Sequence, residues 1–294
     1  MRFPAWILEE VKDLKRNLRD AASSGVRVEL AENRLHTVCQ EALCPNKGEC
    51  FSHGEATFLI LGDACTRNCG FCAVSKKKPI PPDPDEPKKI AELARKWNLK
   101  YAVFTSPTRD DLSDGGAEHF AQTITKLKNI IPEIKTEPLV PDFKGSFKAL
   151  ETVLNANPDV FGHNIETVPS NYEKARKEAD YRRSLNLIKN SKKLRSDIFT
   201  KSGLILGLGE TDKEIENTLN DLREHEVDLL TMGQYLAPSK KHLPVEKYYT
   251  PEEFKEWGEK AKKMGFKAVL SGPLVRSSYK AGYLYEQARK SIDG

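Results

Sequence analysis

The sequence predicts an α/β fold, an incomplete (β/α)6 barrel of the TIM type with an N-terminal and a C-terminal extension. From residue 56 onward, short apolar segments alternate with longer amphipathic segments, a pattern typical of parallel strands joined by crossover helices. The chain has 294 residues, enough to bury the core of a large α/β domain. We therefore expect a barrel over residues 55–235, an N-terminal extension over 1–54 and a C-terminal extension over 236–294.

The predicted elements follow in chain order. Apolar residues recur at helical spacing over residues 6–19, which predicts an amphipathic helix there. Strands are predicted over residues 56–62, 101–105, 134–139, 159–163, 201–206, 228–232 and 266–270. The proline-rich segment 79–87 predicts an extended connector after the first strand, because proline lacks the N–H group that helices need. Helices are predicted over residues 88–97, 117–130, 146–156, 172–190, 212–225 and 251–263.

Charge and composition exclude several classes of function. The 47 basic and 43 acidic residues are mixed along the chain, and the net charge of +4 is too small to indicate nucleic-acid binding. No apolar run approaches the roughly eighteen residues that a membrane span requires. The N-terminus lacks the apolar core of a signal peptide, so we expect a cytoplasmic protein whose thiols stay reduced.

The six cysteines of the chain fall into two groups of three with the spacings C-x4-C-x5-C and C-x3-C-x2-C. The groups are Cys39, Cys44, Cys50 and Cys65, Cys69, Cys72. The second group follows the predicted strand 56–62, at the strand end where α/β barrels place their chemistry. Three thiolates suit a zinc ion or an iron–sulfur cluster, although a structural zinc site normally has four protein ligands. Zinc, and buried thiols without any metal, stay open as alternatives.

The stretch Cys65-Thr-Arg-Asn-Cys69-Gly-Phe-Cys72 resembles the signature of the radical S-adenosylmethionine enzymes. Further stretches resemble one family within that group, the lipoyl synthases: Thr37–Asn46, Arg109–Ala117, Pro158–Thr167, Thr200–Gly203, Gly233–Leu236 and Ser271–Tyr279. Other radical enzymes with auxiliary clusters, such as methylthiotransferases or relatives of biotin synthase, are the alternative within the same chemistry. A zinc-dependent binding module is the alternative outside enzymology.

The resemblance implies a role for each cysteine group. It implies that Cys65, Cys69 and Cys72 hold a radical-generating [4Fe–4S] cluster whose open iron binds S-adenosylmethionine. It implies that the other triad, Cys39, Cys44 and Cys50, holds an auxiliary [4Fe–4S] cluster. The fourth ligand of that cluster would be a serine of Arg276-Ser-Ser-Tyr279, and of the two candidates we choose Ser278 over Ser277.

The resemblance also implies the reaction and the partners. The enzyme would insert two sulfur atoms, taken from the auxiliary cluster, at carbons 6 and 8 of an octanoyl chain attached to a lysine. That lysine belongs to a lipoyl-carrier protein, such as a lipoyl domain or the glycine-cleavage H protein. An electron donor such as ferredoxin or flavodoxin would be a second partner.

Polar residues after the predicted strands are candidates for binding S-adenosylmethionine. Glu137, Asn164 and Glu166 follow or end strands, and their side chains suit ribose hydroxyls or the methionyl ammonium. Arg182 suits the methionyl carboxylate, because arginine forms paired hydrogen bonds to carboxylates. Each of these four residues is equally compatible with a purely structural role.

Overall fold

The computed structural model describes residues 4–9, 21–52 and 55–293, and the remainder of the predicted helix 6–19 lies outside them. One sheet of eight strands runs through the molecule in the order β1 to β8. Its strands are β1 (His36–Thr37), β2 (Phe58–Leu59), β3 (Tyr101–Thr105), β4 (Lys135–Leu139), β5 (Val160–Gly162), β6 (Phe199–Leu206), β7 (Leu229–Gln234) and β8 (Ala268–Ser271). All neighbouring strands from β2 to β8 are parallel, and β1 pairs antiparallel with β2.

The sheet is an open barrel rather than a closed one, as the sequence predicts. In the described part of the chain β1 and β8 are the two edges and do not pair with each other. The sequence analysis missed β1, whose two residues are too short to give an alternating pattern. It placed β8 correctly near the end of the chain, as an addition to six barrel strands.

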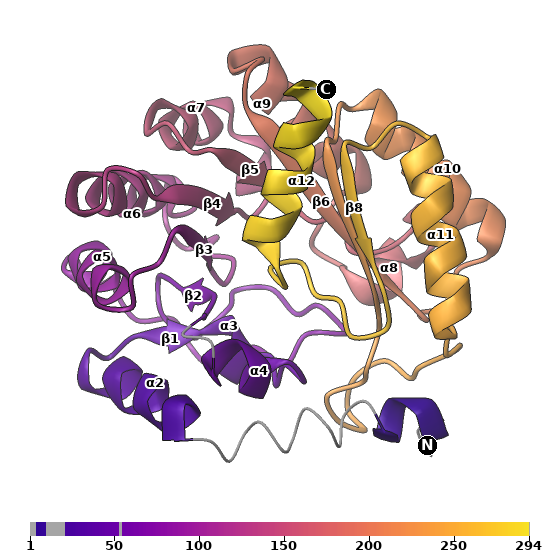
Figure 1. Cartoon of the computed structure of the whole chain (residues 1–294), viewed down its shortest axis with the longest axis horizontal. Coiled ribbons are helices and arrows are strands. Elements are labelled where there is room, and N and C mark those ends of the chain that lie inside the picture. Colours follow the sequence, from indigo (N-terminus) through magenta and orange to yellow (C-terminus); the bar gives the residue numbers. More distant parts are fainter. Residues whose placement is uncertain (1–3, 10–20, 53–54, 294) are drawn as a thin grey trace.

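Helices joining consecutive strands cover the outer face of the sheet (Figure 1). They are α5 (Glu86–Lys96), α6 (Ala117–Ile130), α7 (Phe147–Asn155), α9 (Tyr181–Leu194), α10 (Asp212–Glu224) and α11 (Pro251–Lys263). Side-chain caps fix where several of them begin. Thr211 and Thr250 each accept a hydrogen bond from the backbone N–H three residues on, and the glutamate there accepts one from the backbone N–H of the threonine, which forms a capping box.

The predicted helix 172–190 is wrong in one respect, because the structure divides it. A short helix α8 (Tyr172–Ala175) ends at Arg176, whose backbone leaves the helical region with φ −139° and ψ 53°. The chain turns there, and α9 begins afresh with Asp180 as its N-cap. The break directs the Arg176 side chain inward, where it meets the carbonyl groups of Asn164 and Ile165. Tertiary contacts therefore override the helical pattern at this position.

The final helix, α12 (Ala281–Asp293), closes one end of the barrel. Its residues Leu284, Tyr285 and Ala288 pack against the first residues of strands β5 to β8, including Val160 and Phe199. In Figure 1 this helix, coloured yellow, crosses the sheet. Since α12 covers the beginnings of the strands, the opposite end, where the strands finish, is left for a binding site.

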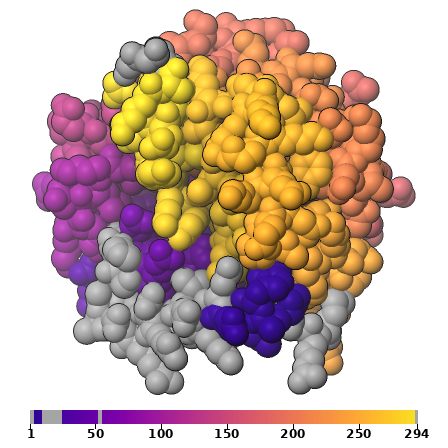
Figure 2. Space-filling model, turned by 45° about the vertical axis from the view of Figure 1, so that its right-hand side comes forward, coloured from indigo at the N-terminus to yellow at the C-terminus, as the bar shows by residue number. Residues whose placement is uncertain are grey.

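The remaining helices belong mainly to the N-terminal extension. They are α2 (Ala21–Glu32), α3 (Val38–Glu41) and α4 (Lys47–Ser52), with the short 3-10 turns η1 (Phe143–Gly145) and η2 (Pro169–Asn171) in the barrel. Residues 5–9 are also helical. Residues 4–9 lie on the surface beside the orange part of the chain (Figure 2). No helix in the described ranges has the length and apolar character needed to cross a bilayer.

Candidate active site

A cavity of about 760 Å³ lies at the carboxyl ends of the strands. Both cysteine groups face it, and every cysteine except Cys50 is among its lining residues. Ser277 and Ser278 of the C-terminal extension also line it. The structure therefore brings together three distant parts of the sequence, around residues 40, 70 and 277, at one enclosed space.

The barrel triad, Cys65, Cys69 and Cys72, lies on a loop, as its turn-forming residues predict. The loop begins directly after β2, where Leu61 and Gly62 both have positive φ angles of 66° and 85°. Gly70 at its centre fits against Leu243 and the carbonyl of Lys174, where a Cβ atom would come within about 3 Å of both. Glycine is therefore required at position 70 for this close approach.

The N-terminal triad, Cys39, Cys44 and Cys50, is distributed over two short helices and the turn between them. Cys39 lies on α3, and Cys50 lies on α4 and donates its backbone N–H to Asn46. A backbone hydrogen bond closes this turn, in which the N–H of Cys44 donates to the carbonyl of Cys39 at 3.1 Å. Helix α3 is tied to the start of β2 by the N–H of Val38, which donates to Thr57.

Burial and nearby positive charges set the protonation of the thiols in both triads. Burial raises the pKa of Cys39 and that of Cys69 to about 11 each, so both stay protonated at neutral pH until a metal displaces the proton. Positive groups reach into both triads, since Arg276 favours the thiolate of Cys44 and Arg176 favours that of Cys69.

The spacing of the sulfur atoms distinguishes a cluster from a single ion. In neither triad, both of which lie within the described residues, do all three sulfur atoms approach within 4.8 Å of one another. A tetrahedral zinc ion with Zn–S bonds of about 2.3 Å would need its sulfur ligands roughly 3.8 Å apart. Sulfur atoms this far apart do not fit a single zinc ion, and three thiolates in each triad are a ligand set of iron–sulfur clusters.

Three polar side chains that line the cavity, those of Asn164, Glu166 and Arg176, are called the polar wall below. Asn164 Nδ2 donates to Glu166 Oε1 at 3.1 Å, and both side chains line the cavity. Arg176 lines it too, and its Nη1 donates to Asn164 O, to Ile165 O and to the Tyr172 hydroxyl. Burial raises the pKa of Glu166, and the charge of Arg176 opposes that rise.

Two buried nitrogen atoms on or beside this wall have no hydrogen-bond partner in the described structure, Arg176 Nε and His163 Nε2. Burial lowers the pKa of His163 to about 4, so the ring is neutral, and its Nδ1 is bound to the carbonyl of Val140 at 2.8 Å. Buried polar atoms are rarely left unpaired. Both nitrogen atoms are buried within the protein rather than exposed to the cavity, so neither marks a contact with a ligand.

Comparison with known proteins identifies the family. The sequence profile of the Radical SAM superfamily matches residues 59–222. Curated lipoyl synthases match over almost the whole chain. The protein from Methylobacillus flagellatus is 51% identical over 98% of this chain and 87% of its own length. That from Caldicellulosiruptor saccharolyticus is 57% identical over 86% of this chain and 88% of its own. The chain belongs to the lipoyl synthase family.

Solved structures support the fold at much lower sequence identity. Methylornithine synthase has a TM-score of 0.57 at 13% identity, covering 95% of this chain and 80% of its own. A maturase of [FeFe]-hydrogenase has a TM-score of 0.58 at 12% identity, covering 95% of this chain and 70% of its own. As a member of the lipoyl synthase family, the chain is a radical S-adenosylmethionine sulfurtransferase whose cofactors are S-adenosylmethionine and [4Fe–4S] clusters.

Two residues that the sequence analysis selected for S-adenosylmethionine do not line the cavity of this lipoyl synthase family member. Glu137 lies inside the barrel, where its carboxylate pairs with Lys201 Nζ at 2.6 Å and accepts from the Tyr101 hydroxyl. Both charged groups are almost completely buried, and each neutralises the charge of the other. Arg182 is exposed on the first turn of α9 and lines a separate hollow beside Gly145. Neither position is therefore assigned to the cofactor.

Arg176 is the cavity residue that sequence reasoning missed. It lies six residues before Arg182, inside a segment whose helical pattern predicts a solvent-facing arginine. The signal that could have located it is weak: the run Arg176-Lys-Glu-Ala-Asp180 ends in a residue that commonly caps a helix. A helix start at Tyr181 implies a turn just before it, and Arg176 opens that turn.

The two C-terminal serines both line the cavity but form hydrogen bonds to different parts of the chain. Ser277 Oγ donates to Asn164 Oδ1 at 2.9 Å, on the polar wall. Ser278 Oγ accepts from Thr57 Oγ1 at 2.7 Å, and the carbonyl of Thr57 accepts from the backbone N–H of Val38, the residue before Cys39. Ser278 is thus the serine beside the N-terminal triad, which favours the choice made from the sequence.

Proposed function

We propose that this chain inserts two sulfur atoms at carbons 6 and 8 of an octanoyl chain attached to a lysine of a lipoyl-carrier protein. The observation that carries the proposal is the single cavity onto which both cysteine triads open. Unactivated methylene and methyl carbons offer nothing for acid–base catalysis, so hydrogen abstraction and sulfur delivery must both occur beside the same enclosed alkyl chain.

We assign the barrel triad, Cys65, Cys69 and Cys72, to the radical-generating [4Fe–4S] cluster. The N-terminal triad, Cys39, Cys44 and Cys50, together with Ser278, is assigned to the auxiliary cluster. When bound, these clusters and S-adenosylmethionine supply the electron, the hydrogen-abstracting radical and the sulfur atoms. In this assignment residues 55–235 form the catalytic barrel, while 1–54 and 236–294 supply the auxiliary ligands.

The polar wall is the proposed binding surface for S-adenosylmethionine. The carboxylate of Glu166 is placed to accept from an ammonium or from ribose hydroxyls, and Asn164 holds it in position through its amide. Arg176 lines the cavity, and its guanidinium would pair there with a ligand carboxylate, the group that an arginine binds most specifically. Asn164 and Glu166 keep the roles expected from the sequence, and Arg176 takes the role first given to Arg182.

The cavity between the two triads suits an alkyl chain. Its lining includes the apolar side chains of Val38, Leu59, Phe71, Val140 and Leu236. Such a lining excludes water from the reacting carbons and buries an octanoyl chain favourably. The carrier protein would present that chain from solution, an electron donor such as ferredoxin or flavodoxin would bind separately, and the reaction would take place in the cytoplasm.

The test is an anaerobic assay with purified, iron-reconstituted protein, S-adenosylmethionine, a strong reductant and an octanoyl-lysine peptide of a lipoyl carrier. Mass spectrometry should show the peptide gaining two sulfur atoms, with 5′-deoxyadenosine formed alongside. A brown protein that forms 5′-deoxyadenosine but leaves the octanoyl group unchanged would indicate a different radical enzyme. A colourless protein that holds zinc would contradict the whole proposal.

A further inference from the structure

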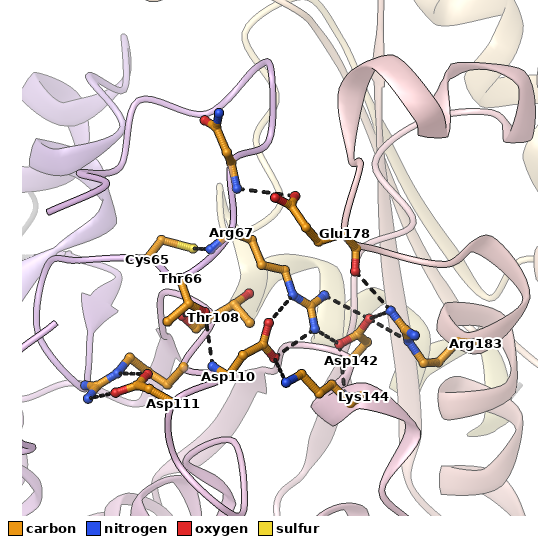
Figure 3. A network of polar contacts seen from close by, with 12 residues as sticks. Cys65, Thr66, Arg67, Thr108, Asp110, Asp111, Asp142, Lys144, Glu178 and Arg183 are labelled. Atoms are coloured by element: carbon orange, nitrogen blue, oxygen red, sulfur yellow. Dashed lines mark hydrogen bonds and ion pairs between the residues drawn. The ribbon is translucent and has the colours of Figure 1, made fainter. Parts of the chain in front are cut away.

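Arg67 lies within the barrel cysteine loop, between Cys65 and Cys69, but its side chain points away from the cavity. The side chain is 5% exposed, and it does not line the cavity. Its guanidinium binds two carboxylates at once (Figure 3). Nε and Nη2 donate to Asp110 at 2.7 and 3.0 Å, and Nη1 and Nη2 donate to Asp142 at 3.0 and 2.7 Å.

The two carboxylates belong to different loops at the rim of the barrel. Asp110 follows β3, and Asp142 follows β4 and caps the turn η1. Asp142 is completely buried and also accepts from Arg183 Nε, at the start of α9, at 2.8 Å. Burial alone would raise the pKa of Asp142, but its bonds to Arg67 hold that pKa well below its usual range. The carboxylate is therefore ionised whenever the chain is folded.

The neighbours of Arg67 are attached to the same loops. Thr66 Oγ1 donates to the carbonyl of Thr108 at 2.9 Å and accepts from the backbone N–H of Asp110 at 3.0 Å. The backbone N–H of Asn68 meets the carboxylate of Glu178 at 3.4 Å (Figure 3). Three consecutive residues of the cysteine loop are thus held by rim loops rather than by one another.

The charge of Arg67 is used entirely within this network. Two carboxylates surround it, and neither Asp110 nor Asp142 lines the cavity. Arg67 is therefore not placed to balance the charge of a bound cofactor or to touch a substrate. Its backbone, in contrast, is part of the thiol-bearing loop, since its N–H lies 3.4 Å from Cys65 Sγ. What its side chain holds in place is the loop itself.

We propose that Arg67 is a positioning residue that fixes the three barrel thiols in their cluster-binding arrangement before any metal is bound. The proposal rests on the assignment of Cys65, Cys69 and Cys72 to a cluster. Lysine cannot replace Arg67, because one ammonium group cannot form paired hydrogen bonds to two carboxylates. Outer groups that orient metal ligands commonly change metal retention by roughly ten- to a hundredfold.

The test compares Arg67→Lys and Asp142→Asn with Arg195→Lys in the full-length chain. Arg195 is the matched control, because it also binds one aspartate, Asp197, through two nitrogen atoms, but lies just before β6 at the opposite end of the barrel. Asp142→Asn keeps the shape of the side chain and removes its charge, so it tests the pair if Arg67→Lys does not fold.

The first measurement uses metal-free protein and hydrogen exchange of residues 65–72. Both network variants should exchange about tenfold faster than wild type in this segment alone, and Arg195→Lys should match wild type. This readout needs no cluster. If the wild-type protein never binds iron, the proposed function is wrong. The exchange measurement still tests the role of Arg67 in that case.

The second measurement uses reconstituted protein. Arg67→Lys should release iron from the barrel triad about tenfold faster to a chelator, and the change that S-adenosylmethionine causes in the electron paramagnetic resonance spectrum of the reduced protein should weaken. The N-terminal triad should keep its iron. Unchanged exchange over 65–72, or a loss of thermal stability with normal iron release and a normal spectrum, would overturn the proposal and make Arg67 a purely structural residue.

Discussion

The two cysteine triads open onto one cavity but are held in different ways. The barrel triad lies on a loop fixed by a buried arginine that joins two carboxylates. The N-terminal triad lies on two short helices joined to the rest of the chain by separate hydrogen bonds. One runs from Asn46 to the carbonyl of Leu274, and another from Thr57 to Ser278. The first attachment is a network of paired charges, and the second is a set of separate hydrogen bonds, which also includes the Tyr279 hydroxyl donating to the carboxylate of Glu49 on α4.

This difference matches the two roles proposed for the triads. A cluster that transfers electrons in every turnover must keep its geometry, and a network of paired charges resists distortion. A cluster that gives up sulfur must come apart, and a hydroxyl oxygen such as that of Ser278 is a weaker ligand for iron than thiolate. Separate single hydrogen bonds allow the surrounding helices to adjust as ligands are released.

The largest expected effects come from removing each triad in turn. Replacing Cys65, Cys69 and Cys72 with Ala should halve the iron content from about eight atoms per chain and abolish 5′-deoxyadenosine formation. Replacing Cys39, Cys44 and Cys50 with Ala should also halve the iron, yet leave cosubstrate cleavage intact and prevent carbon–sulfur bond formation. Iron analysis and product chromatography measure both outcomes.

Each triple variant serves as the control for the other, since both remove three free cysteines, one complete triad in each case. Loss of both activities in the N-terminal variant would mean that this triad is structural. Reductive cleavage of S-adenosylmethionine by the barrel variant would show that the radical cluster had been assigned to the wrong cysteines.

A smaller effect should separate the two serines. Ser278→Ala should still assemble two clusters but form roughly ten- to a hundredfold less lipoyl product, because the auxiliary cluster loses a protein ligand. Ser278→Cys should bind that cluster more tightly and also turn over poorly. Ser277→Ala loses one hydrogen bond to Asn164, so its KM for S-adenosylmethionine should rise about fivefold with little change in kcat.

Steady-state kinetics of the three variants decide between the serines. If Ser278→Ala forms product at the wild-type rate, the hydroxyl is only part of the turn before α12. If instead Ser277→Ala is the variant that loses product at normal cosubstrate binding, the choice between the two serines was wrong.

The sequence predicted those parts of this site that depend on local spacing. The two cysteine patterns, and the strand that precedes the barrel triad, follow from residues close together in the chain. Glu137 was selected because it lies in a predicted strand end and Arg182 because of its chemical type, and tertiary packing decided the positions of both. A lysine sixty-four residues away pairs with Glu137 inside the barrel. The helical segment is interrupted at Arg176, and as a result Arg176 rather than Arg182 faces the cavity. The residues next to Glu137 and Arg176 in the sequence give no indication of such long-range partners.

The smallest expected effect tests the neutral attachment of the N-terminal triad. Asn46 is 2% exposed, and its Nδ2 donates to the carbonyl of Leu274 at 2.7 Å, which joins the triad to the segment carrying the serines. Asn46→Ala leaves that buried carbonyl without this partner, at a cost of about 1 kcal/mol in the free energy of unfolding.

The matched control for Asn46→Ala is Asn33→Ala, because Asn33 Nδ2 makes a bond of the same length, 2.7 Å, to the carbonyl of Glu29 within its own helical segment. Both variants should lose similar stability in denaturant titrations, since each loses one side-chain-to-backbone hydrogen bond. Only Asn46→Ala should release iron from the N-terminal triad faster, by roughly fivefold, because only its bond joins that triad to the C-terminal extension. Equal iron release from the two variants would mean that the neutral bonds do not hold the auxiliary site. The two triads would then differ in how they are attached, but this difference would not affect how well they retain a cluster.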